Sequence, residues 1–203
     1  MPRQTRKTAP DKQHHADKLQ RFESITEANA LTILRILAER NKNVAIEIDA
    51  IAKELLSGSD FDEIAAQVQM TCEMLQVEDV WDRAGPKRDG YVDTGEAAWT
   101  MLEEALQPFR DKVSQCKQQK MLKEADLTCQ GILKGIYDFD QESSTAYKGW
   151  ATDLPREYFK MILSDWKRLF GKRAPYIRME NFLTTHCSVW STSAMTSLRP
   201  QKA

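Results

Sequence analysis

The residues best suited to chemistry in this 203-residue chain are acidic side chains gathered in the segment VEDVWDRAGPKRDGYVDTGEAAW, residues 77–99. The carboxylates of this segment are Glu78, Asp79, Asp82, Asp89 and Asp93. Paired carboxylates act as general acid and base, or they hold a divalent metal ion. Acidic residues are also common beside turns, where they cap helices, and no histidine lies nearby. We therefore expect a structured loop between helices here and assign no catalytic residue.

Other catalytic and metal-binding groups are scarce. Residues 16–185 contain no histidine, which is the usual base beside a serine or cysteine nucleophile. His14 and His15 lie near the N-terminus, and the pair His186–Cys187 supplies too few ligands for a zinc site. No phosphate-binding glycine motif occurs. The thiols fall on or near apolar stripes and are interpreted as reduced core residues: Cys72, Cys116, Cys129 and Cys187. We expect no enzymatic activity, no metal and no cofactor.

A second acidic run, DFDQES, places Asp138, Asp140 and Glu142 at alternate positions, as in a calcium-binding loop. An EF-hand loop that began at Asp138 would need glycine at its sixth position and glutamate at its twelfth. The chain has Ser143 and Gly149 there, so we expect a turn at the end of a helix.

The elements that must position these residues are helices. Apolar residues recur at intervals of three and four, which predicts helices with one buried face, and glycine is rare. Ser24 and Glu27 form a capping-box pattern, and Pro108 predicts a bend or break in its helix. The clearest helical segments are 24–40, 46–58, 59–75, 94–109, 122–140 and 153–171. We predict an all-α fold of about seven or eight helices, as a bundle or a short stack of αα-hairpins.

Charge is unevenly distributed along the chain. Residues 1–21 carry a net charge of +4 and residues 166–203 carry +6, which leaves −11 for residues 22–165 when the total is −1. We expect a disordered basic tail over 1–16, one domain over 17–190 and a disordered tail over 191–203. There is no apolar signal segment and no run of about 20 apolar residues, so we expect a cytoplasmic protein without membrane contact.

The aromatic residues beside the long loop suggest a protein-binding surface. Trp and Tyr are typical anchors of protein interfaces, as is Arg. The predicted partner contacts are Trp81, Arg83, Tyr91, Tyr147 and Trp150. For Trp150 an alternative stays open, in which it is buried at the start of the following helix.

The basic C-terminal region gives the alternative of nucleic-acid binding. Its cations are interleaved with aromatic residues, and clustered cations and exposed rings bind phosphates and bases. Trp166 and Phe170 also fit the buried stripe of their helix, and an acidic body would repel a duplex. The basic ends could also lie on the acidic body of the same or another subunit. The candidate cations are Lys167, Arg168, Lys172, Arg173 and Arg178.

Residues 60–165 resemble an uncharacterised family of bacterial all-helical proteins. The resemblance is carried by VEDVWDRAGPKRDGYVDTGEAAWTMLEEALQPF and by CQGILKGIYDFDQESSTAYKGWATDLP. Similar segments occur alone or C-terminal to SWIM zinc-finger regions, but the C-x-C and C-x-H elements of that finger are absent here. The resemblance implies a helical module without assigned catalysis. We therefore expect a non-enzymatic adaptor that binds another protein, such as an accessory or regulatory subunit of a bacterial signalling or defence complex, with self-association left open.

Overall fold

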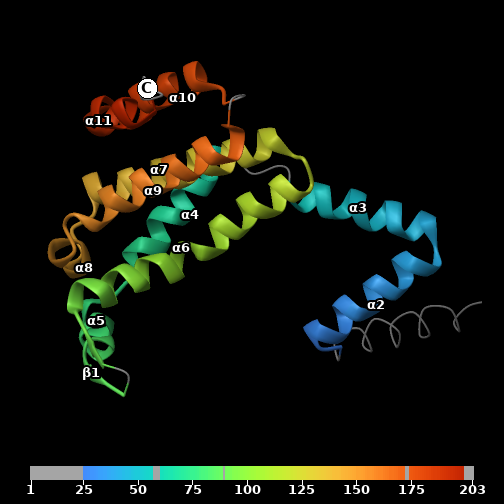
Figure 1. Ribbon diagram of the computed structural model, residues 1–203, viewed down its shortest axis with the longest axis horizontal. Coiled ribbons are helices and arrows are strands. Elements are labelled where there is room, and N and C mark those ends of the chain that lie inside the picture. The colour runs from blue at the N-terminus through green and yellow to red at the C-terminus, as the bar shows by residue number, and fades with distance from the viewer. Residues whose placement is uncertain (1–24, 57–59, 89, 172–173, 199–203) are drawn as a thin grey trace, which may run out of the picture. The chain divides into compact units, whose positions relative to one another are not determined.

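The computed structural model describes residues 25–56, 60–88, 90–171 and 174–198 (Figure 1). These residues fall into two compact units, the first ending at Leu55 and the second beginning at Leu56. The prediction of one domain over 17–190 stays a prediction.

The described residues are almost entirely helical, which confirms the all-α prediction. They form ten helices and one two-stranded hairpin, rather than seven or eight helices, because short helices contain too few turns to show a periodic pattern. The predicted arrangement as a bundle or a short stack of αα-hairpins stays a prediction. The helices are α2 Glu27–Arg40, α3 Lys42–Leu56, α4 Phe61–Glu73, α5 Val77–Arg83, α6 Thr94–Gln118, α7 Leu122–Glu142, α8 Ala146–Trp150, α9 Leu154–Phe170, α10 Tyr176–His186 and α11 Ser188–Leu198, and the strands are β1 Gly85–Lys87 and β2 Gly90–Val92.

Unit 1 contains α2 and α3, which meet at Asn41 and diverge from that junction (Figure 1). The Thr26 hydroxyl caps α2 by accepting a hydrogen bond from the Asn29 backbone N–H at 3.4 Å. The predicted cap, Ser24, lies outside the described residues. Neither helix contains a buried residue, so the expectation of one buried face is wrong within this unit.

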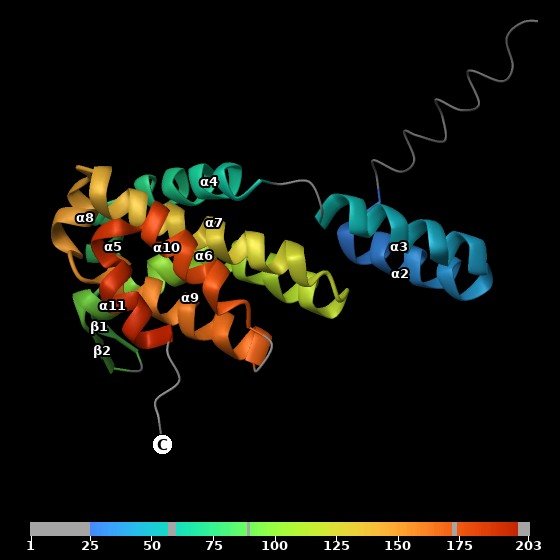
Figure 2. The ribbon, with the colours of Figure 1, turned by 90° about the horizontal axis from the view of Figure 1, so that it is seen from above.

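The core of unit 2 is built around α7, which lies between α4 and α9 (Figure 2). The helix α6 contacts both α4 and α7, while α10 and α11 contact α7 and α9 from another side (Figure 1). The helix α7 buries apolar side chains along much of its length, including Ile132, Leu133 and Phe139. The apolar spacing seen in the sequence therefore identifies the helix faces that form this core.

Two glycines allow α4 and α7 to approach closely. Gly131 and Gly135 are four residues apart and therefore lie on one face of α7. A Cβ atom at Gly135 would lie 2.5 Å from the Ala65 carbonyl oxygen and 2.6 Å from the Val68 Cβ. A Cβ atom at Gly131 would lie 2.6 Å from the Ile64 Cβ. Any larger residue at either position would force the two helices apart.

The helix α6 is continuous from Thr94 to Gln118 and includes Pro108. The helix is therefore not broken at Pro108, and the predicted bend stays a prediction. Proline lacks a backbone N–H and so removes one hydrogen bond from the helix. Leu106 precedes Pro108 in α6 and Cys116 follows it, and both side chains are fully buried. Their packing keeps both halves of α6 in one helix.

The C-terminal segment differs from its prediction. Residues 191–198 belong to α11 and are not a disordered tail, because Trp190, Ala194 and Leu198 are buried against the rest of unit 2. The sequence STSAMTSL is rich in small polar residues, so its apolar spacing is weak. The predicted tail over 1–16 and residues 199–203 lie outside the described part. No helix in the described ranges is long and apolar enough to cross a bilayer.

Candidate functional site

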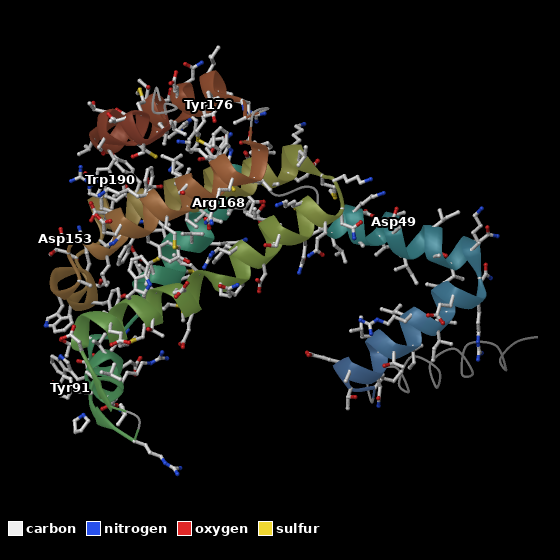
Figure 3. All side chains as sticks on the ribbon, viewed as in Figure 1. Asp49, Tyr91, Asp153, Arg168, Tyr176 and Trp190 are labelled. Carbon is white, nitrogen blue, oxygen red and sulfur yellow. The ribbon has the colours of Figure 1, made fainter. Side chains whose placement is uncertain are left out.

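Three exposed aromatic residues lie at one end of unit 2. Trp81 is 57% exposed, Tyr91 is 72% exposed and Trp150 is 43% exposed, and the other described Trp, Tyr and Phe side chains are buried or half-buried. They belong to α5, β2 and α8, and α5 contacts both α6 and α8. Figure 1 shows α5, the hairpin and α8 together at this end, and Figure 3 labels Tyr91 there. We call Trp81, Tyr91 and Trp150 the aromatic surface.

Helix α5 is held on unit 2 by Val77 and Val80, which are buried. Trp81 lies in the last turn of α5 and is exposed. An ion pair at 2.6 Å joins the Arg83 guanidinium to the Glu104 carboxylate and connects the end of α5 to α6. Both side chains are about half exposed, so this pair contributes at most about 1 kcal/mol to stability. Arg83 lies two residues after Trp81, and its role as a partner contact stays a prediction.

The hairpin places Tyr91 at an exposed position. Its strands are antiparallel, with Pro86 opposite Tyr91 and Gly85 opposite Val92. Gly85 and Gly90 have φ values of 91° and 142°, which only glycine adopts readily. The sequence analysis expects a structured loop here, and the two strands were not predicted because each has only three residues.

The hairpin is also connected to α5. The Lys87 ammonium group donates a hydrogen bond to the Asp82 carbonyl oxygen at 2.9 Å. This bond crosses from β1 to the helix that carries Trp81, so the two exposed parts of the aromatic surface are held by one local structure.

Tyr147 does not belong to the exposed surface, and its prediction as a partner contact is wrong. Its side chain is buried, and its hydroxyl donates a hydrogen bond to the Ala98 carbonyl oxygen at 2.7 Å. Burial raises the pKa of this hydroxyl, which keeps it protonated as a donor. Thr145 caps α8 by accepting from the Lys148 backbone N–H at 3.3 Å. Tyr147 therefore anchors α8 on α6 and fixes the helix that carries Trp150.

Trp150 is half exposed, so the alternative of full burial is excluded. It lines a shallow pocket together with Ala98, Asp153 and Leu154, and Figure 3 labels Asp153 at this end of unit 2. The pocket joins the ring of Trp150 to the start of α9.

The described acidic residues of segment 77–99 lie at helix ends and do not converge on one catalytic or metal-binding site. The Asp93 carboxylate caps α6 by accepting from the Gly95 backbone N–H at 2.8 Å. Glu78 and Asp79 lie in the first turn of α5, where their negative charges interact favourably with the positive end of the helix dipole. Asp89 is outside the described residues. Within the described ranges, no group of three or more His, Cys, Asp or Glu side chains could hold a metal ion.

The acidic run at 138–142 lies within α7, which continues to Glu142, and does not form a loop. Asp138 makes an ion pair with Lys134, one helical turn earlier. The Gln69 amide donates to the Glu142 carboxylate at 3.1 Å and links α4 to α7. These carboxylates therefore stabilise the helix and its packing.

The described candidate cations of the basic region have intramolecular partners. The Lys167 ammonium donates to the Ser197 carbonyl oxygen at 2.6 Å, and Arg168 pairs with Asp165. Arg178 pairs with Asp126 at 3.4 Å. Trp166 is fully buried, so it is unavailable for stacking on a base. The remaining candidates, Lys172 and Arg173, lie outside the described residues.

A buried carboxylate in α7 was missed by the sequence reasoning. Asp126 is 2% exposed and accepts a hydrogen bond from the Trp166 indole N–H at 2.7 Å and from the Gln130 amide at 3.0 Å. Together with Arg178, these partners satisfy a charge that burial alone would destabilise. The sequence feature that could have identified it is an aspartate between Ala125 and Cys129, on the apolar stripe of a predicted helix.

A second polar cluster, also missed, joins α6 to α9. The Arg110 guanidinium lies 3.2 Å from Glu103 and 3.5 Å from Asp165. The buried Tyr158 hydroxyl makes no hydrogen bond of normal geometry, and burial raises its pKa to about 12 while the Arg110 charge acts in the opposite direction. The adjacent pocket of about 380 Å³ is lined by Arg110 and Asp165 and by core residues that include Cys129. Its opposite charges offset one another, so we interpret the cluster as structural.

The thiols do not form a reactive centre. All four are buried, and burial raises the pKa of Cys72 and Cys187 to about 12. The His186 ring packs against Phe61 and Phe182, with ring centres 5.2 Å and 5.1 Å apart. His186 and Cys187 therefore contribute to packing.

Comparison with protein-family models, curated proteins and solved structures finds no match. The resemblance to SWIM-associated helical segments therefore stays a prediction, and the functional argument depends on the geometry of the chain itself.

Proposed function

We propose that this protein is a non-enzymatic protein-interaction module and that the aromatic surface binds its partner. The observation that carries the proposal is the exposure of Trp81, Tyr91 and Trp150 at one end of unit 2, in contrast with the covered aromatic residues elsewhere in the described ranges. Interface hot spots are enriched in Trp and Tyr, and in Arg, which Arg83 supplies beside them.

The energy available at this surface is sufficient for specific binding. An aromatic side chain with about half of its area exposed offers roughly 100 Å² for burial. At about 25 cal/mol per Å², each ring then contributes on the order of 2–3 kcal/mol, which is the magnitude of a hot-spot residue. The scaffold is fixed by the buried Val80 and by the hydrogen bond of Tyr147, so little order must be gained on binding.

The non-enzymatic part of the proposal is supported by the roles of the reactive groups. Asp93 is a helix cap, Asp138 is ion-paired, and the cysteine thiols are buried. An accessory role in a bacterial signalling or defence complex is the biological setting that we propose.

Nucleic-acid binding through the basic region has weaker support, because Lys167, Arg168 and Arg178 have intramolecular partners. A salt titration distinguishes the two functions, since phosphate contacts strengthen steeply at low salt. Failure of a labelled duplex and a labelled single strand to bind at about 50 mM salt excludes the alternative.

The proposed function is tested by affinity capture with matched variants. The tagged protein and its Trp81→Ala/Tyr91→Ala/Trp150→Ala variant are compared with an Ile177→Ala control, which changes an equally exposed apolar residue on α10. We expect the wild type and the control to retain the same partner, and the triple variant to lose it. Equal retention by the triple variant would contradict the proposal.

A further inference from the structure

The two helices of unit 1 expose a large aliphatic surface. These side chains are between 39% and 78% exposed, and neither α2 nor α3 has a buried residue. The exposed large aliphatic residues are Leu31, Ile33, Leu34, Ile36, Leu37, Ile46, Ile51 and Leu55. We call this set the aliphatic face.

Short helices with this much exposed apolar surface are normally covered by other protein segments. Each has 14 or 15 residues, a length at which an isolated helix is only marginally stable in water. The helix α2 presents apolar residues on several sides, since Leu34 and Ile36 are about 200° apart around its axis. A helix that is apolar on most sides is normally buried.

We propose that α2 and α3 form a self-association element, in which the aliphatic face packs against the same face of a second copy of this chain. The pair is antiparallel, so that the Asn41 junction of one copy lies beside the open ends of the other. Four helices then enclose one apolar core, which is a common arrangement for short amphipathic helices.

The available area fits a dimer. The aliphatic face exposes on the order of 700 Å² of apolar surface, close to the roughly 800 Å² per partner that a standard protein interface buries. Apolar burial at the centre of an interface is also typical of homodimers. In a four-helix arrangement each helix has more than one neighbour, so apolar residues on more than one side of α2 can be covered.

The charges around this face are complementary in the antiparallel arrangement. The junction segment, residues 35–42, carries Arg35, Arg40 and Lys42 against Glu39 and has a net charge of +2. The outer segments, residues 27–34 and 43–56, carry four acidic residues against Lys53 and have a net charge of −3. An antiparallel pair places each basic junction beside acidic ends, whereas a parallel pair would place the two junctions together.

The described part of unit 2 offers no comparable surface to cover the aliphatic face. Its exposed aliphatic and Met residues are distributed over four different helices: Met70 on α4 and Met74 at its C-terminal end, Leu122 on α7, Ile177 on α10 and Val189 on α11. The aromatic surface lies on further elements and is not used by this interaction, so the two surfaces are independent.

Sedimentation equilibrium of the full chain tests the proposal. We expect twice the chain mass for the wild type at micromolar concentration. Leu34→Asp and Ile51→Asp place a charge in the aliphatic face, and together they should weaken association at least 100-fold and give the chain mass. Ile177→Asp adds the same charge to unit 2 and should remain dimeric. A monomeric wild type, a dimeric double variant or a monomeric Ile177→Asp control would each overturn the proposal.

The double variant can be checked for folding independently. All five Trp and all five Tyr residues of the chain lie in residues 81–190, within unit 2. Near-ultraviolet circular dichroism therefore reports unit 2 alone, and we expect an unchanged spectrum. Loss of that spectrum would show that unit 2 depends on the substituted positions and would overturn the proposed independence of unit 1.

A distance measurement tests the orientation. With spin labels at Asn41→Cys, an antiparallel dimer separates the two junctions by about one helix length, on the order of 20 Å. The native thiols are buried and should remain unlabelled. A separation near 10 Å, the spacing of packed helices, would mean that the junctions meet and would overturn the antiparallel arrangement.

Discussion

Gly135→Ala tests the packing of α4 on α7, on which unit 2 depends. The added Cβ would lie 2.5 Å from the Ala65 carbonyl oxygen, about 1 Å less than an ordinary contact, which begins near 3.4 Å. The second contact, at 2.6 Å, is the Cβ of Val68. Neither atom can move away by a side-chain rotation, so α4 itself must shift.

The expected loss of stability follows from two opposing effects. Overpacking of a tightly packed contact costs about 3 kcal/mol, while alanine gains about 1 kcal/mol over glycine in a helix. The net loss is about 2 kcal/mol, which lowers the melting temperature of a domain of this size by about 4–8 °C.

A matched substitution separates the two effects. Gly149 lies in α8, and a Cβ atom there would meet nothing within 4 Å. Gly149→Ala should therefore stabilise by up to about 1 kcal/mol. Chemical denaturation followed by tryptophan fluorescence measures both changes. A Gly135→Ala variant that is as stable as the wild type, or more so, would refute the close approach of α4 and α7.

Three further predictions concern individual side chains. Trp150→Ala should lower the free energy of unfolding by less than about 1 kcal/mol, because the ring is half exposed; a large fall in melting temperature would place it in the core. Trp166→Phe removes the donor to buried Asp126 and should cost at least about 2 kcal/mol in a denaturant titration, and a neutral result would contradict that hydrogen bond. The raised pKa values of Cys72 and Cys187, about 12, leave little thiolate at pH 8, so a thiol reagent should label them quickly only after denaturation, and rapid labelling of native protein would disprove their burial.

The sequence predicts the long helices of unit 2 well, because apolar spacing indicates which helix face is buried there. The segment predicted over 153–171 coincides with α9, which has Pro155 in its first turn and Gly171 as its C-cap. The hairpin, the helix α8 and the helix α11 were not predicted, because short elements and Ser/Thr-rich helices carry little periodic signal.

The candidate site was predictable only in part. Composition identifies Trp81, Tyr91 and Trp150 as unusual, but it cannot separate them from Tyr147, which lies three residues from Trp150 and is buried. Burial depends on contacts between distant segments, such as that of Tyr147 with Ala98. The partners of Asp126 are likewise remote in sequence, apart from Gln130.

Site-specific photo-crosslinking tests the proposed function most directly. A photoreactive phenylalanine analogue replaces Tyr91, which is 72% exposed, and in a parallel experiment it replaces Ile177, which is 76% exposed. Irradiation in cells should join position 91 to a second protein and leave position 177 without that adduct. No adduct at position 91, or the same adduct at both positions, would contradict a binding role for the aromatic surface.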